Sequence, residues 1–234
     1  MIRSLIPAAL ALLAAAALAG GSVQAADAAH PLVVELFQSQ GCSSCPPANA
    51  NVLALANRAD ILTLSFQVTY WDQLGWKDTF ASPKFTARQW DYATGLHHDG
   101  VFTPQVVVNG RRDGVGADPR ELNRLILAAE RGASGPALNL NDKVVTIAAA
   151  APPATPAEVW LVRYDPRIVQ VAIKRGENGG RTLPHKNVVR ELIRLGAWRG
   201  AAETLALPAG DPTLRTAILV QGAHGGPILA AVTG

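Results

Sequence analysis

Residues 32–56 read LVVELFQSQGCSSCPPANANVLALA and hold both cysteines of the chain, Cys42 and Cys45. The apolar run before the pair predicts a buried strand, and the run behind it predicts a helix. The cysteines therefore fall in the turn between a strand and a helix. At such a turn the unpaired backbone N–H groups and the helix dipole favour a thiolate. The stretch predicts a reactive thiol pair.

A structural disulfide and a metal site are the alternatives to a redox pair. A disulfide that closes so short a loop stabilises a fold by only about 2 kcal/mol on the loop-entropy model, against about 4.7 kcal/mol for a loop of about 100 residues. A zinc site needs four ligands, but there is no second cysteine pair, and His97 and His98 are adjacent and point apart. We therefore expect no zinc site. A two-thiolate site for Cu(I), which suits soft ligands, stays an alternative.

Along the first half of the chain, apolar runs alternate with helical patterns. The segment DPRELNRLILAAERG carries helix start and stop signals, with Asp118 as N-cap, Pro119 in the first turn and Gly132 beyond the end. Alternating strands and helices indicate a layered α/β domain over residues 30–133. The expected strands are residues 32–37, 61–66 and 105–110, and the expected helices are residues 46–59, a stretch near 82–96 and the segment from Asp118.

After a predicted linker at residues 132–137, GASGPA, the apolar runs become shorter and more extended. Turn signals separate them, and a hairpin turn is predicted at residues 141–142. The pattern indicates a smaller, sandwich-like β-rich domain over residues 136–234. Residues 187–198, NVVRELIRLGAW, fit either a strand or one face of a helix.

Residues 1–25 have the layout of a secretory signal peptide. A single basic residue, Arg3, precedes an apolar run at residues 5–20, and small residues end at Ala25. A membrane anchor is the alternative, but the run is shorter than the roughly 20 residues of a spanning helix and contains Pro7. We expect a periplasmic or secreted protein without stable membrane insertion after signal removal. The basic residues are scattered, so we expect neither nucleic acid nor a membrane surface as the main partner.

The order of the predicted elements resembles the thioredoxin fold: a strand, Cys-X-X-Cys, a helix, a strand, a helix, and then a proline that enters a strand. Four segments are similar to the family called domain of unknown function 1223: VELFQSQGCSSCPPA, YWDQLGWKDTFASPKFTARQ, VFTPQVVVNG and GENGGRTLPHKNVVR. The resemblance implies an exported bacterial protein with a thioredoxin-like N-terminal domain. Fold alone does not establish an activity.

The resemblance also implies roles for single residues. Cys42 would be the attacking thiol and Cys45 the resolving thiol. Pro104 would be a cis-proline that faces the pair, and Thr103 would border the groove for an extended substrate. Glu35 lies in a run that should be buried, close to where thioredoxins keep an acid that shuttles the resolving thiol's proton. Its offset from Cys42 is seven residues, one more than in thioredoxins, and a strand-edge carboxylate in water is the alternative.

An aromatic segment with Tyr70, Trp71 and Trp76 follows the second predicted strand. These side chains either line a substrate groove or pack the loop onto the core. A later segment, GENGGRTLPHKN at residues 176–187, is also open to two interpretations. It either forms turns only, or its basic side chains hold an anionic ligand or the N-terminal domain. The side chains in question are Arg181, His185 and Lys186.

The sequence predicts thiol–disulfide exchange with protein or small-molecule thiols and disulfides, without a cofactor. A binding or assembly module that keeps the fold as a scaffold is the alternative. The sequence holds no motif of zinc proteases, P-loop proteins or nucleophile elbows. Because Cys42 precedes the predicted helix, we expect it to be the more exposed thiol with the lower pKa, and Cys45 to be shielded.

Overall fold

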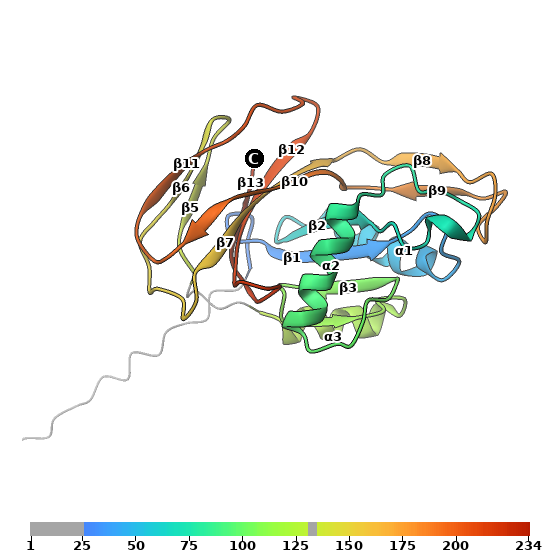
Figure 1. Cartoon of the computed structure of the whole chain (residues 1–234), viewed down its shortest axis with the longest axis horizontal. Coiled ribbons are helices and arrows are strands. Elements are labelled where there is room, and N and C mark those ends of the chain that lie inside the picture. Colours follow the sequence, from blue (N-terminus) through green and yellow to red (C-terminus); the bar gives the residue numbers. More distant parts are fainter. Residues whose placement is uncertain (1–25, 131–134) are drawn as a thin grey trace, which may run out of the picture.

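The computed structural model describes residues 26–130 and 135–234 (Figure 1). The predicted signal peptide and part of the predicted linker lie outside these residues. No helix among those described is long and apolar enough to cross a membrane. The elements are β1 (Leu32–Gln38), α1 (Cys45–Leu55), β2 (Ile61–Gln67), the 3₁₀ helix η1 (Asp72–Leu74), α2 (Pro83–Gly95), β3 (Gln105–Val108), β4 (Arg112–Gly114), α3 (Pro119–Ala128), β5 (Leu138–Leu140), β6 (Val144–Ile147), β7 (Ala157–Asp165), β8 (Val169–Ala172), β9 (Thr182–His185), β10 (Val188–Trp198), β11 (Glu203–Ala206), β12 (Arg215–Gln221) and β13 (Ile228–Thr233).

A mixed eight-stranded sheet forms the centre of the molecule, in the order β13-β12-β7-β10-β2-β1-β3-β4. β1 and β2 are parallel, because α1 carries the chain back along the sheet between them. β3 pairs antiparallel with β1, and β4 pairs antiparallel with β3. The α/β class that the sequence predicts is confirmed.

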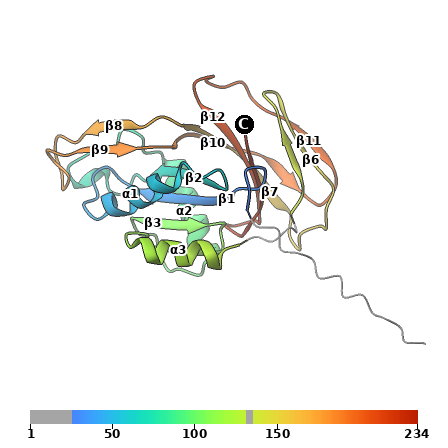
Figure 2. The ribbon, with the colours of Figure 1, turned by 180° about the vertical axis from the view of Figure 1, so that it is seen from behind.

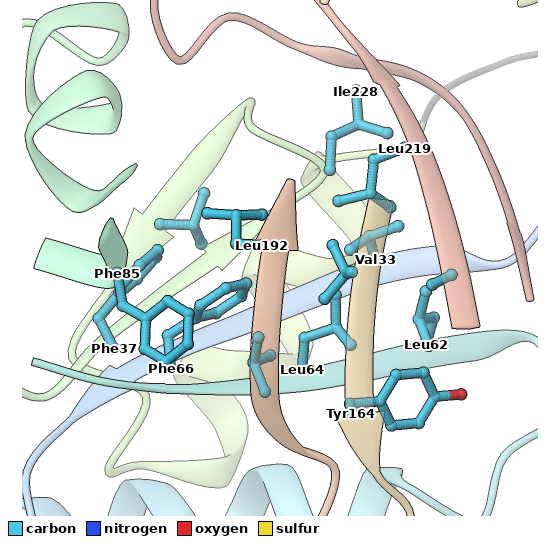
Figure 3. Close-up of a cluster of buried hydrophobic side chains, with 14 of the residues drawn as sticks. Val33, Phe37, Leu62, Leu64, Phe66, Phe85, Tyr164, Leu192, Leu219 and Ile228 are labelled. Atoms are coloured by element: carbon cyan, nitrogen blue, oxygen red, sulfur yellow. The ribbon is translucent and has the colours of Figure 1, made fainter. Parts of the chain in front are cut away.

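Helices cover both faces of this sheet near β1. In Figure 1, α2 lies in front of the sheet, and the view from behind in Figure 2 shows α1 and α3 on the other face. Side chains alternate between the two faces along β1. Leu32, Val34 and Leu36 belong to the apolar cluster with α1 and α3. Val33 and Phe37 belong to the cluster with α2, part of which Figure 3 shows.

The C-terminal strands extend the same sheet. The backbone N–H of Ser65 in β2 donates to the carbonyl oxygen of Asn187 at 2.9 Å, and Val188 of β10 pairs with Ser65 in parallel register. β7, β12 and β13 follow in antiparallel order. The two regions predicted from sequence, residues 30–133 and 136–234, therefore share one sheet. Local periodicity indicates strands and helices but not which strands pair.

A three-stranded sheet of β11, β6 and β5 packs on the C-terminal part of the large sheet. Val145 and Ile147 of β6 meet Val159 and Leu161 of β7 in a third apolar cluster, so this region has a sandwich-like arrangement. The hairpin turn predicted at residues 141–142 is confirmed, because β5 and β6 pair antiparallel on either side of it. The segment that fitted either a strand or a helix is strand β10.

Local signals placed the start of α3 correctly. The side chain of Asp118 accepts a hydrogen bond from the backbone N–H of Arg120 at 2.8 Å, and Pro119 opens the helix.

The hairpin of β8 and β9 lies beside α1 (Figure 2). There the side-chain amide of Asn49 in α1 donates to the carbonyl oxygen of Pro184 in β9 at 2.7 Å. The C-terminal region thus contacts the helix that follows the cysteines.

Candidate active site

The cysteine pair lies between the end of β1 and the start of α1. α1 begins at Cys45, so Cys42 precedes the helix, and Pro46 and Pro47 occupy the first turn. A proline there removes no helix hydrogen bond, because the first N–H groups of a helix have no partner within it. Cys42 and Cys45 form a disulfide with their Cα atoms 5.4 Å apart. The predicted pair at a strand-to-helix turn is therefore present.

The segment before β3 lies against this disulfide. The Thr103–Pro104 peptide bond is cis, as predicted, and Pro104 is buried. The carbonyl oxygen of Thr103 lies 3.9 Å from Sγ of Cys42. The side-chain Oγ1 of Thr103 lies 3.2 Å from Sγ of Cys45. Cys42 and Thr103 are 61 residues apart in the chain. The structure brings both cysteines together with Thr103, which directly precedes Pro104.

The aromatic segment reaches the same turn. Trp76 donates its Nε1–H to Oε1 of Gln40 at 2.9 Å. The ring of Trp71 lies beside Gly41, where an added Cβ would come within 3.2 Å of Trp71 Cδ1. Tyr70 donates its hydroxyl hydrogen to a glutamine of α2 at 3.2 Å, and burial raises the pKa of Tyr70 to about 12. The two tryptophans therefore contact the residues just before the first cysteine, while Tyr70 joins the segment to α2.

Sequence reasoning missed a buried carboxylate in this segment, that of Asp78. Its Oδ2 accepts a hydrogen bond from the backbone N–H of Gln40 at 2.7 Å, and its Oδ1 accepts one from Phe80 at 2.8 Å. Burial raises the pKa of Asp78 to about 7, although these hydrogen bonds oppose the rise. An aspartate in a polar loop carries no local signal of burial, since the residues that cover it are distant in sequence.

The segment between β8 and β9, residues 174–181, lies on the cysteine turn, and we call it the hairpin loop. Its Asn178 donates side-chain hydrogen bonds to the carbonyl oxygens of Gln40, at 2.9 Å, and Cys42, at 2.8 Å. Asn178 is fully buried. The glycine-rich sequence of this loop indicates turns, and no local pattern in it points to the cysteines. Sequence reasoning therefore missed this part of the site as well.

Glu177 makes a second set of contacts with the cysteine turn. Its carboxylate accepts hydrogen bonds from the backbone N–H of Ser43, at 3.0 Å, and from the Ser43 hydroxyl, at 2.8 Å. These two bonds, the backbone one foremost, lower the pKa of Glu177. Beneath the loop the exposed fractions of Cys42 and Cys45 are 0% and 1%. The expectation that Cys42 is the more exposed of the two cysteines is wrong, because both are buried in the disulfide form.

Glu35 is buried but lies on the other face of the sheet from α1. Its Oε1 accepts a hydrogen bond from Nε of Arg88 at 2.7 Å, and its Oε2 accepts hydrogen bonds from Arg88 and from the hydroxyl of Tyr92. The interpretation of Glu35 as a carboxylate in water is therefore wrong. Leu36, six residues before Cys42, faces α1 instead. The structure does not bring Glu35 together with the cysteine pair.

The basic side chains of residues 176–187 point toward the N-terminal region or the hairpin loop. Lys186 donates to Oδ1 of Asn57 at 2.7 Å, and Arg181 donates to Oδ1 of Asn178 at 2.8 Å. His185 is buried, and its Nδ1 lies 3.5 Å from Nε2 of Gln38. Burial, followed by repulsion from a nearby arginine, lowers the pKa of His185 to about 4. Contact with the N-terminal region is confirmed for Lys186 and His185, whereas Arg181 bonds within the hairpin loop.

Within residues 26–130 and 135–234, no group of three or more histidine, cysteine, aspartate or glutamate side chains is arranged to hold a metal ion.

The cysteine turn offers two sulfur atoms, one hydroxyl group beside each of them, and the start of a helix. Ser44 Oγ lies 3.2 Å from Sγ of Cys42, and Thr103 Oγ1 occupies the corresponding position at Cys45. Hydroxyl groups at these positions can donate to a thiolate or accept from a thiol.

These features define an α/β protein with a mixed sheet and a disulfide-forming cysteine pair at a helix start. Its family is defined by sequence. The chain belongs to the family described as protein of unknown function (DUF1223), whose profile matches residues 33–221. The family that the sequence resembles is thus confirmed.

Two solved structures are similar to this chain. The crystal structure of protein AGR_C_4864 from Agrobacterium tumefaciens is 32% identical with a TM-score of 0.72, over 90% of this chain and 95% of that one. HBP35 of Porphyromonas gingivalis is 14% identical with a TM-score of 0.58, over 88% of this chain and 74% of that one, and this likeness concerns the fold alone. A search of curated proteins finds no match.

Proposed function

We propose that the protein carries out thiol–disulfide exchange through Cys42 and Cys45, on a thioredoxin-like unit formed by residues 30–133. One observation carries the proposal: the disulfide lies at a helix start with Thr103 in contact with both sulfurs. The arrangement β2-β1-β3-β4, with α1 between parallel β1 and β2, supports the thioredoxin-like assignment. Export to an oxidising compartment, as the N-terminal sequence predicts, suits such a pair.

The exchange proceeds in two displacement steps. A substrate thiolate attacks Sγ of Cys42, so that a bond forms between the two sulfurs and the bond to Cys45 breaks. Cys45 leaves as a thiolate. A second substrate thiolate then attacks the substrate sulfur of the mixed disulfide and releases Cys42. Two electrons pass from the substrate thiols to the protein disulfide, and their two protons end on Cys42 and Cys45. The reverse sequence reduces a substrate disulfide and restores the Cys42–Cys45 disulfide.

The second candidate is a binding or assembly module in which the disulfide is structural. The observation that favours it is the burial of both sulfurs, because exchange requires one sulfur to be reached by a thiolate. The two candidates differ in the reduction potential of the pair. Structural disulfides have potentials below about −300 mV, whereas exchange proteins lie between about −120 and −270 mV.

The test equilibrates the purified protein with glutathione buffers and measures the fraction of Cys42–Cys45 disulfide by thiol labelling. We expect a potential in the range of exchange proteins. Replacing Cys45 with Ser should let mixed disulfides accumulate on Cys42, whereas replacing Cys42 with Ser should prevent both exchange and trapping. A potential far below about −300 mV, with no trapping in either variant, would instead favour the structural role.

A further inference from the structure

The hairpin loop, residues 174–181, comes from the C-terminal region and is fixed on the turn that holds both cysteines. Asn178 in this loop has 0% exposure and donates to two carbonyl oxygens of the turn, at 2.9 and 2.8 Å. Its own Oδ1 accepts a hydrogen bond from Arg181 at 2.8 Å, within the loop. The hydrogen bonds of this buried side chain go only to the cysteine turn and to the loop itself, so Asn178 attaches the loop specifically to the turn.

The stem and the tip of this hairpin are held differently. The stem residues Val171, Ile173 and Leu183 form an apolar cluster against which Trp76 and Phe80 of the aromatic segment pack. The tip contains three glycines, and every tip residue except the buried asparagine is exposed. The tip is therefore held on the cysteine turn by hydrogen bonds of Asn178 and Glu177, whereas the stem is held by apolar packing.

Glu177 occupies hydrogen-bond donors of the residue that follows Cys42. The backbone N–H of Ser43, which follows Cys42 directly, donates to the Glu177 carboxylate at 3.0 Å. N–H groups at a helix start stabilise a nearby thiolate, whereas a carboxylate beside it has the opposite effect. The carboxylate thus holds the loop on the turn, one residue from Cys42.

We propose that the hairpin loop is a lid over the disulfide, held closed by Asn178 and Glu177, and that Glu177 is the positioning residue that keeps Cys42 unreactive. This inference rests on the proposed thiol–disulfide exchange. A substrate thiolate reaches Sγ of Cys42 only when the tip is displaced. Displacement frees the Ser43 N–H at the same time, so access and activation of Cys42 occur together.

The first test measures how fast a water-soluble trialkylphosphine reduces the disulfide of the full chain. The phosphine needs only access to a sulfur atom; it becomes a phosphine oxide with oxygen from water, and two thiols form. Glu177→Ala removes two hydrogen bonds to the tip, and we expect reduction at least about tenfold faster than in wild type. Arg175→Ala, an exposed change in the same tip, is the matched control and should leave the rate unchanged.

A pair of glycine variants tests displacement without touching Glu177. A Cβ at Gly176 would lie 3.2 Å from Cβ of Trp76, whereas a Cβ at Gly180 would meet no atom within 4 Å. The two glycines have similar positive φ angles, 76° and 82°, so backbone strain is comparable in both variants. Gly176→Ala should speed reduction by the phosphine, and Gly180→Ala should have a much smaller effect.

The reactivity of Cys42 gives a readout that a purely structural loop would not change. In the reduced protein, the pH profile of alkylation by iodoacetamide reports the pKa of the Cys42 thiol. Glu177→Gln keeps an acceptor for Ser43 but removes the charge, so we expect alkylation of Cys42 to begin at lower pH than in wild type. Glu177→Ala should lower that pH at least as far.

The outcomes separate the lid from the proposed function. If all loop variants are reduced at the wild-type rate and alkylated with the wild-type pH profile, the lid is overturned, and the glutathione equilibrium still decides whether the pair exchanges. If the variants are reduced faster by the phosphine but no variant exchanges with glutathione or protein thiols, the lid stands and the proposed function fails.

Discussion

The carboxylate of Glu35 and the guanidinium of Arg88 form an ion pair in which both side chains are buried, 1% and 3% exposed. The hydroxyl of Tyr92 donates to the same carboxylate. Removing one partner of a buried ion pair leaves an uncompensated charge in a poorly solvated place. The position of this pair, on the α2 face of the sheet, indicates a structural role for Glu35 rather than proton transfer to the cysteines.

Replacing Glu35 with Ala should lower the free energy of unfolding by about 3 to 5 kcal/mol, because Arg88 loses its counter-charge. Tyr92→Phe, which keeps the ion pair, should lower it by only about 1 kcal/mol. Urea unfolding measures both. At temperatures where the variants are folded, thiol exchange should match wild type; a selective loss of exchange in the Glu35 variant would restore the proton-shuttle interpretation.

Two buried titratable groups make opposite contributions to stability between pH 4 and 7. Burial lowers the pKa of His185 to about 4 from 6.5, so the unfolded chain takes up a proton first as the pH falls. Burial raises the pKa of Asp78 to about 7 from 3.8, so the unfolded chain loses a proton first as the pH rises. His185 therefore reduces stability toward acid pH, and Asp78 reduces it toward neutral pH.

Single variants should show how each group changes the free energy of unfolding with pH. His185→Phe removes the opposing contribution of His185, so the Asp78 contribution should lower the free energy of unfolding as the pH rises from about 4 to 7, by up to about 4 kcal/mol. In Asp78→Asn it should instead rise with pH between about 4 and 6.5, by up to about 3 kcal/mol. Urea titrations at several pH values measure the slopes. Parallel curves for wild type and both variants would contradict the assignment of these pKa shifts.

At the scale of elements, the helices were predictable where their signals are local. The N-cap Asp118 and the proline after it lie within one turn of α3, and the structure has them as predicted. β10 was ambiguous because its apolar residues match both the helical and the extended spacing. Its pairing with β7 along its length and with β2 at its start selects the strand. Those partners lie far from it in sequence.

The junction between β2 and β10 depends on Asn187. This residue has a positive φ of 51°, and its side-chain amide donates to the carbonyl oxygen and the hydroxyl of Thr63, at 3.0 and 2.8 Å. Its own carbonyl oxygen accepts from Ser65 in β2. Asparagine tolerates the left-handed backbone better than most side chains do, and here its amide also bonds the neighbouring strand.

Two substitutions of Asn187 should separate these effects. Asn187→Gly keeps the left-handed backbone and loses the amide bonds to Thr63, which we expect to cost about 1 to 3 kcal/mol. Asn187→Ala loses the same bonds and adds backbone strain of about 1 to 2 kcal/mol. Urea unfolding gives the difference. Equal losses in the two variants would mean that the backbone conformation contributes nothing at this junction.

At the scale of the whole molecule, the N- and C-terminal regions share an apolar cluster as well as a sheet. Phe66 of β2 and Phe85 of α2 belong to the same buried cluster as Val189, Leu192 and other side chains of the C-terminal strands. The start of β10 also pairs with the edge of β2. Without the C-terminal strands, the N-terminal region would expose both an apolar face and an unpaired strand edge, the features that promote aggregation.

A fragment that ends at residue 130 should therefore not fold by itself. We expect it to lack a cooperative unfolding transition by circular dichroism and to be poorly soluble, whereas the chain from residue 26 to 234 unfolds in one transition. Co-expression with residues 135–234 is the control and should restore soluble protein. A soluble fragment with a sharp transition would instead support two independent domains, as the linker-like sequence at residues 132–137 predicts.

The sequence by itself determined the strand-to-helix turn around the cysteines, the proline before β3, the N-cap of α3 and the α/β class. Each of these depends on residues within a few positions of one another, so composition and periodicity contain them. The alternation of side chains along β1 can also be read from the sequence, because successive residues of a strand face opposite sides of the sheet. Once α1 is placed on one side, this alternation puts Glu35 on the other.

Only the tertiary structure decided which distant residues contact the cysteine turn. Ser43 and Glu177 are 134 residues apart, and the Asn178 bond to Cys42 spans 136 residues. Asn178 and Glu177 lie in a glycine-rich turn, and their polar side chains would be equally compatible with full exposure to water. Their role depends on the pairing of β10 with β2, which carries the β8–β9 hairpin to the cysteine turn. Contacts of this range are fixed by the packing of the whole chain, because no local preference specifies them.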